Sequence, residues 1–334
     1  MHKLRIATRR SALAVTQTKL AAEEIVRRNS GVAAGALTNT PLDYELVELS
    51  TEGDRRLDRP LSSFGGKGVF VKELEVALLE HRADIAVHSL KDMPAELLPQ
   101  FKLAAVLKRE DPRDCFIAKG GAGGVMFMDL PAGSRVGTGS VRRVVQLKEI
   151  RPDLEYVPIR GNIQTRIAKL SELDGVVLAA AGLKRMGLDD LVTEYFDAQK
   201  MLPASGQGIL AIETLLQPSL ELEQILARAN DARTYNVAVA EMAFLKALNA
   251  GCQYPVAAHA EYKINNSFNN VACENNVVNI DNVACKDNVM CINGIYWFEP
   301  KQVLLRARVE GECATDEQAR ELGCRLASKI AEQF

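Results

Sequence analysis

The chain has 334 residues, of which 47% are hydrophobic and 25% charged, and its net charge at pH 7 is −2. This length allows two or three domains with separate cores, and the composition is ordinary for a globular protein. The small net charge excludes a general attraction to nucleic acid or to a membrane surface, and no apolar run is long enough to span a bilayer. The seven cysteines lack C-x-x-C spacing, which favours free thiols, so we expect a cytoplasmic protein.

The N-terminal segment predicts a strand followed by a capped helix. Residues 4–7 are a short apolar strand, and a helical pattern runs from Ser11 to about Arg28. If Ser11 caps this helix, the free N–H groups of its first turn and the guanidinium of Arg9 converge on one anion site. A plain strand-to-helix turn with solvated arginines is an equally good interpretation of this segment alone.

A lysine and an aspartate follow the next buried strand. Residues 44–50 alternate as a strand, the glycine-containing stretch 50–67 predicts a long loop with a candidate lid at 54–63, and 71–82 predicts an amphipathic helix. The apolar strand 84–88 then leads directly to Lys91 and Asp92. Ligands of open α/β sheets bind beyond the carboxyl ends of strands, so this pair is a candidate site, with a surface ion pair as the alternative.

Arginines follow three strands of a second βα pattern. The predicted strands are 115–118, 134–137, 154–159 and 175–180, and the arginines after the last three are Arg142, Arg143, Arg160, Arg166 and Arg185. Each guanidinium matches a carboxylate or phosphate, so their repeated position predicts a cleft for a polyanion. Residues 137–140 resemble part of a dinucleotide fingerprint but lack its third glycine, and 65–68 lack the spacing of a P-loop.

The last part of the chain returns to the first sheet and then forms a third unit. Residues 209–213 predict a strand that rejoins the first sheet. The first domain is then discontinuous, and two strands that join the domains form a hinge. Residues 220–249 are helical, with Asp231 as an N-cap for the helix that ends near Gly251. Cys252 follows on a short turn, where it is either a buried helix-end thiol or, beside cations, a reactive thiolate.

Residues 264–293 contain ten asparagines and a period of six. A small meander or a disordered insertion both fit this pattern. The cysteines of the repeat match no standard zinc spacing, so we assign no metal. Beyond it, 296–298 and 303–309 predict strands and 316–333 a closing helix.

Several of these stretches occur together, in one order, in a known family. They are Ile6-Ala-Thr-Arg9-Arg-Ser11, Gly65-Gly-Lys-Gly-Val-Phe70-Val-Lys-Glu-Leu74, His88-Ser-Leu-Lys91-Asp92-Met-Pro94, Val136-Gly-Thr-Gly-Ser-Val-Arg142-Arg143, Arg160-Gly-Asn162, Ala181-Gly-Leu-Lys-Arg185-Met-Gly-Leu188, Gly206-Gln-Gly208 and Gly251-Cys252-Gln253. From Leu4 to about Ala260 the chain resembles the porphobilinogen deaminase (hydroxymethylbilane synthase) family, whereas the Asn-rich stretch departs from the family pattern.

The resemblance implies an α/β fold of two domains like type II periplasmic binding proteins plus a smaller third α/β domain with an antiparallel sheet. On this basis we expect domain 1 at 1–108 and 209–227, domain 2 at 109–208, and domain 3 at 228–334 with the insertion at 264–293. It also implies a transferase of haem biosynthesis with a dipyrromethane cofactor attached through Cys252. Four porphobilinogen units are added head to tail with loss of ammonia, and hydrolysis releases hydroxymethylbilane.

Roles for individual residues follow from the matching motifs. Asp92 matches the catalytic carboxylate, and the positions that bind cofactor or substrate carboxylates are Arg9, Ser11, Lys91, Arg142, Arg143, Arg160, Arg166 and Arg185. The resemblance implies porphobilinogen as the small-molecule substrate, no nucleic acid or membrane partner, and a monomer. Two alternatives stay open from the residues: a non-catalytic anion-binding protein on the same scaffold, and a pyridoxal-phosphate enzyme that uses Lys91.

Overall fold

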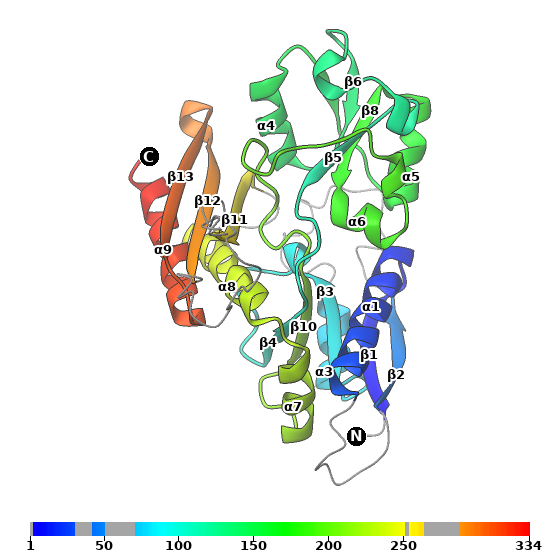
Figure 1. Ribbon diagram of the computed structural model, residues 1–334, viewed down its shortest axis with the longest axis vertical. Coiled ribbons are helices and arrows are strands. Elements are labelled where there is room, and N and C mark those ends of the chain that lie inside the picture. The colour runs from blue at the N-terminus through cyan, green and yellow to red at the C-terminus, as the bar shows by residue number, and fades with distance from the viewer. Residues whose placement is uncertain (1–2, 31–41, 51–70, 251–253, 264–287) are drawn as a thin grey trace, which may run out of the picture.

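The computed structural model describes residues 3–30, 42–50, 71–250, 254–263 and 288–334, which form three sheets with their helices (Figure 1). Three features predicted above lie outside these residues. They are the candidate lid at 54–63, the Gly251-Cys252 turn, and residues 264–287 of the Asn-rich stretch.

The first sheet has the strand order β2-β1-β3-β10-β4. Its strands are β1 (Lys3–Arg9), β2 (Asp43–Leu49), β3 (Ile85–Ser89), β4 (Phe101–Val106) and β10 (Leu210–Leu215). β1 is parallel to β2 and β3, whereas β10 lies antiparallel between β3 and β4. The predicted return of the chain to this sheet is therefore confirmed.

Helices cover both faces of the first sheet. α1 (Ala12–Asn29) and α7 (Leu220–Ala229) share one core with β1, β3 and β10, and α3 (Lys72–Leu79) packs on the opposite face. The stretch predicted as helical over 220–249 forms two helices, and the predicted N-cap at Asp231 is confirmed. α7 ends at Ala229 and α8 (Ala232–Ala247) begins after two intervening residues, because Asp231 has extended backbone and caps α8 through its side chain.

The second sheet repeats the same topology, with the order β7-β6-β8-β5-β9. Its strands are β5 (Asp114–Ala118), β6 (Arg135–Gly137), β7 (Glu155–Val157), β8 (Gly175–Ala179) and β9 (Glu194–Tyr195), and its helices are α4 (Val141–Ile150), α5 (Ile163–Ala168) and α6 (Ala180–Arg185). β6 is parallel to β7 and β8, and β5 is antiparallel to β8. Two lobes with one antiparallel strand within each parallel core confirm the predicted fold class.

The third sheet is antiparallel, in the order β11-β12-β13, and packs against α8 and α9 (Asp316–Ala331). Its strands are β11 (Val256–Tyr262), β12 (Val289–Phe298) and β13 (Val303–Glu312). The last residues of the Asn-rich stretch form part of β12. Residues 289–293 belong to β12 because Met290 and Ile292 enter the core of this unit, which makes the strand longer than the predicted 296–298.

One buried carboxylate joins the third unit to both crossovers, which are the segments 107–113 and 196–209 that connect the two lobes. Glu241 of α8 is fully buried and accepts hydrogen bonds from Arg109 Nη1 at 2.7 Å, the Gly206 N–H at 2.5 Å and the Ala260 N–H at 2.8 Å. Burial raises the pKa of Glu241, but Arg109 and His259 together lower it below its usual value. The third unit is therefore held, through an ionised carboxylate, where the chain passes between the lobes.

Candidate active site

The predicted residues of the first lobe lie at one edge of its sheet. β1 and β3 are parallel neighbours, so Arg9 at the end of β1 and the turn η2 (Leu90–Asp92) after β3 share the carboxyl edge. Ser11 caps α1 as predicted, because its side chain accepts a hydrogen bond from the Ala14 N–H at 3.3 Å.

Lys91 and Asp92 differ in their exposure. Asp92 is exposed, whereas Lys91 is partly buried and its Nζ donates to Gln207 Oε1 at 3.3 Å. Burial lowers the pKa of Lys91 to about 8; Asp92 opposes this shift and Arg143 adds to it. Lys91 thus changes charge just above neutral pH, beside a carboxylate that is open to solvent.

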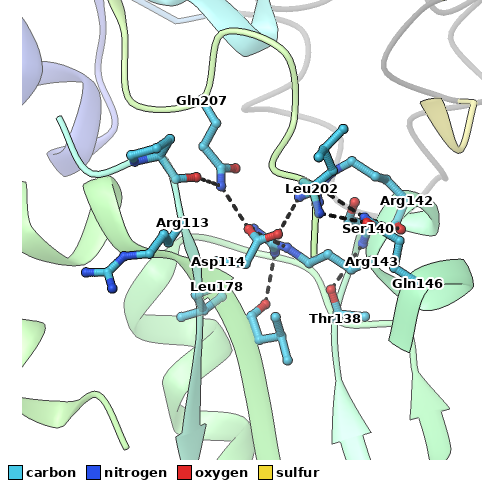
Figure 2. Close-up of polar contacts among 12 residues, drawn as sticks. Arg113, Asp114, Thr138, Ser140, Arg142, Arg143, Gln146, Leu178, Leu202 and Gln207 are labelled. Atoms are coloured by element: carbon cyan, nitrogen blue, oxygen red, sulfur yellow. Dashed lines mark hydrogen bonds and ion pairs between the residues drawn. The ribbon is translucent and has the colours of Figure 1, made fainter. Parts of the chain in front are cut away.

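Arg142 and Arg143 lie in the first turn of α4 and share one buried counter-ion (Figure 2). Asp114, the first residue of β5, is fully buried and accepts from Arg142 Nη2 at 2.8 Å and from Arg143 Nη2 at 2.7 Å. Arg143 also donates to the Val177 carbonyl at 2.9 Å, and Arg142 donates to the Leu202 carbonyl. The arginine pair is therefore rigidly oriented by protein groups.

The charges of this cluster depend on one another. Burial would raise the pKa of Asp114, but Arg142 and Arg143 lower it well below the usual range. Burial also lowers the pKa of Arg142, and Asp114 counteracts this. Two guanidiniums and one carboxylate leave a net positive charge inside the second lobe, which favours an anion beside it.

The other three arginines of the second lobe follow β7 and β8. Arg166 on α5 donates from Nε to the Gly161 carbonyl at 2.8 Å, and burial lowers its pKa, with Arg143 and Asp92 among the charges that act on it. Arg160 is exposed just after β7. Arg185, at the end of α6, donates from Nη2 to the Gly208 carbonyl at 2.6 Å, and burial lowers its pKa to about 10.

The two sets of residues face each other. α6 of the second lobe lies against the N-terminal end of α1 of the first lobe (Figure 1), and a Cβ at Gly182 would be 4.0 Å from Leu13 Cδ2. The charges of Asp92 and Arg143 both act on Arg166, which places the acid of one lobe near the cations of the other. Cys252 lies outside the described residues, on the connection from α8 to β11.

The structure differs from the sequence-based view of Arg142 and Arg143, and it adds two residues. The pair was expected in a loop after the strand 134–137, lining a cleft, but the structure places both residues on a helix with buried side chains. The sequence analysis missed Asp114 and Gln207, whose Nε2 donates to Asp114 Oδ1 at 2.9 Å. An aspartate at the start of the buried strand 115–118 was a signal for Asp114, since a buried carboxylate needs a cationic partner.

The fold and this site define a class: two-lobed α/β proteins in which cationic side chains and an exposed aspartate gather at the carboxyl edges of the two sheets, an arrangement suited to an anionic small molecule. Within the described residues, no group of three or more histidine, cysteine or acidic side chains is placed to hold a metal ion. No described helix is long and apolar enough to cross a bilayer.

Comparison with known proteins identifies the family. Residues 4–220 match the family described as "Porphobilinogen deaminase, dipyromethane cofactor binding domain", and residues 235–332 match "Porphobilinogen deaminase, C-terminal domain". The chain is 48% identical over 264 residues to the porphobilinogen deaminase of Syntrophus aciditrophicus, which covers 78% of this chain and 81% of that protein. It is 46% identical over 263 residues to those of Shouchella clausii and Geobacter sulfurreducens, which covers 78% of this chain and 80% and 78% of those proteins.

The chain therefore belongs to the porphobilinogen deaminase family. This confirms the family predicted from the sequence, the transferase class and the dipyrromethane cofactor. It also decides against the non-catalytic anion-binding protein that the residues alone left open.

Proposed function

We propose that this chain condenses four porphobilinogen molecules head to tail, with loss of one ammonia at each addition, and releases hydroxymethylbilane by hydrolysis. The observation that carries the proposal is the placement of Asp92 and Lys91 at the edge of the first sheet, within electrostatic reach of Arg143 and Arg166 of the second lobe. An extending chain of pyrroles gains carboxylates with each unit, and desolvated guanidiniums at this edge are suited to bind them.

The residues present fit the dipyrromethane group of this family. Arg166 and Arg185 are partly buried cations whose pKa values are lowered by burial, so carboxylates beside them would offset the cost of their desolvation. Arg9, Ser11, Lys91 and the remaining arginines of the second lobe would hold the other carboxylates. When bound, the group supplies the pyrrole carbon to which the first porphobilinogen unit is joined.

Asp92 is proposed as the catalytic carboxylate. Its exposure leaves its oxygens open to accept hydrogen bonds from pyrrole N–H groups. When ammonia leaves the aminomethyl group of porphobilinogen, the remaining methylene carries positive charge, and an ionised carboxylate stabilises that charge. The same carboxylate can assist the proton transfers of each addition.

Cys252 is proposed as the point of attachment, through a thioether. It follows α8 and precedes β11, so its carrier is the third unit, which Glu241 holds against both crossovers. A covalent anchor would keep the growing product in the site and make each later addition effectively intramolecular.

The wider organisation is also a proposal. We place domain 1 at 1–108 and 209–227, domain 2 at 109–208 and domain 3 at 228–334, which agrees with the membership of the three sheets. We propose that the protein acts as a cytoplasmic monomer on a small-molecule substrate, without nucleic acid or membrane partners, in keeping with its net charge of −2.

Turnover of porphobilinogen tests the proposed function. Purified protein should consume porphobilinogen, measured with Ehrlich's aldehyde reagent, and release a linear tetrapyrrole that cyclises to uroporphyrinogen on acidification and is measured as uroporphyrin after oxidation with benzoquinone. The Cys252→Ala variant should show neither reaction. Wild-type protein that makes no tetrapyrrole, even when supplied with preformed dipyrromethane, would exclude the proposal.

A further inference from the structure

Gln207 contacts the site from the crossover that returns to the first lobe, and it has no part in the proposed function. It is 1% exposed. Its Oε1 accepts from Lys91 Nζ at 3.3 Å, and its Nε2 donates to Asp114 Oδ1 at 2.9 Å and to the Pro112 carbonyl at 2.7 Å. One side chain therefore touches the ammonium of the first lobe, the buried carboxylate of the second and the outgoing crossover.

The orientation of this amide is determined by its partners. The Asp114 carboxylate and the Pro112 carbonyl only accept hydrogen bonds, so the NH₂ group must face them. The amide oxygen then faces Lys91, whose ammonium only donates. A flipped amide would place donors against the ammonium and an acceptor against two acceptors.

The backbone around Gln207 holds the side chain in place. Gly206 and Gly208 have φ of 73° and 90°, a region that favours glycine. A Cβ at Gly206 would lie 2.9 Å from the Lys91 backbone nitrogen, so this turn packs directly on the Lys91 backbone. The Gln207 carbonyl also accepts from Arg109 Nε at 2.8 Å, which ties the same residue to the other crossover.

We propose that Gln207 is a positioning residue that joins the Lys91–Asp92 turn to the Asp114–Arg142–Arg143 cluster across the two crossovers. Its amide oxygen holds the Lys91 ammonium at the place where the ammonium would later bind a carboxylate of the pyrrole. Its NH₂ group fixes that place relative to Arg142 and Arg143 through Asp114. The contact to Lys91 is the longest of the three, so it is the one that separates when Lys91 turns to a carboxylate. The inference rests on the proposed function for the identity of that carboxylate.

The titration of Lys91 tests this role without any turnover. Trace acetylation of the full-length protein across a pH series, read by peptide mass spectrometry, gives the midpoint for Lys91. In Gln207→Met the ammonium loses an acceptor, so the midpoint should fall by about half a unit to one unit. Gln207→Glu keeps an oxygen towards Lys91, so its midpoint should equal or exceed that of the wild type, whether the new carboxyl is protonated or ionised. Gln199→Met, an exposed glutamine before the same crossover, is the matched control and should leave the midpoint unchanged.

Steady-state kinetics provide the second measurement. A positioning role predicts that Gln207→Met raises KM for porphobilinogen about tenfold, with a smaller change in kcat, and that Gln207→Glu restores part of the loss. A Lys91 midpoint that does not fall in Gln207→Met, or that falls equally in Gln207→Glu, would overturn the inference. If Gln207→Met does not fold, a Lys91 midpoint in Gln207→Glu that lies below the wild-type midpoint is sufficient to overturn the inference. Wild-type protein without turnover would instead overturn the proposed function, and the Lys91 titration would still decide the role of Gln207.

Discussion

Removal of the buried charge at Asp114 tests the electrostatic organisation of the second lobe. Asn has the shape of Asp but no charge, so Asp114→Asn leaves Arg142 and Arg143 without their shared counter-ion. Their side chains are 5% and 6% exposed, and that of Asp114 is 0% exposed. Removal of one member of such a buried pair costs about 3–5 kcal/mol of unfolding free energy.

The assay must report on the second lobe, because unfolding of a three-unit chain need not be two-state. Urea unfolding followed by circular dichroism gives the overall effect, and hydrogen exchange of α4 and β8 amides gives the local one. The matched control is Asp153→Asn. Asp153 pairs with Arg151 at 2.6 Å but is 38% exposed, so its removal should cost about 0–1 kcal/mol.

The pH dependence gives an independent check with a defined sign. The folded pKa of Asp114 is lowered, mainly by Arg142 and Arg143 against the effect of burial. Its stabilisation is therefore complete above the unfolded value of about 3.9 and is lost as the pH falls from there towards the folded pKa. Asp114→Asn should flatten this acid limb. A loss below about 1 kcal/mol, equal to that of Asp153→Asn, would refute the argument for a buried counter-ion.

Three further predictions concern the site and the crossover. Asp92→Asn should lower kcat about 10²–10⁴-fold while the unfolding free energy changes by less than about 0.5 kcal/mol, because Asp92 is exposed; turnover near the wild-type rate would contradict its role. As the pH rises above the Lys91 pKa of about 8, the ammonium loses its proton and KM for porphobilinogen should increase. Lys91→Arg should remove this increase, because the guanidinium stays charged. A wild-type KM that does not change with pH through this range would contradict the role of Lys91. Gly208→Ala should lower the free energy of unfolding in urea by at least about 2 kcal/mol, because φ is 90° and the new Cβ would lie 2.3 Å from the Glu110 carbonyl oxygen. The control Gly133→Ala, at φ 80° with open space around the new Cβ, should cost about 1 kcal/mol. Equal losses in the two variants would show that the close contact at Gly208 is unimportant.

Local signals were sufficient to predict much of the fold. Ser11 and Asp231 cap their helices as expected, since a side-chain oxygen before an apolar period is a local feature. The apolar strand before Lys91 and the returning strand near residue 210 were also recognisable from short runs. By contrast, β11 (Val256–Tyr262) was missed because its alanine-rich sequence has no alternation, and its pairing with β12 decides its structure.

The candidate site was predictable to the extent that single residues carry its chemistry. Asp92 and Lys91 follow a buried strand, so their position at a sheet edge could be inferred. The burial of Arg142 could not, because its counter-ion Asp114 is 28 positions away and becomes a neighbour only when the second sheet forms. The role of Gln207 depends on a contact 116 positions away, to Lys91, for the same reason.

The central claim is that Cys252 anchors an anionic pyrrole chain, which Asp92 helps to extend beside the arginines of the second lobe. Intact mass spectrometry after limited addition of porphobilinogen tests it most directly. Wild-type protein should show discrete covalent increments, each equal to one porphobilinogen less one ammonia, and Cys252→Ala should show none. Wild-type protein without such increments, or the same increments on Cys252→Ala, would contradict the account.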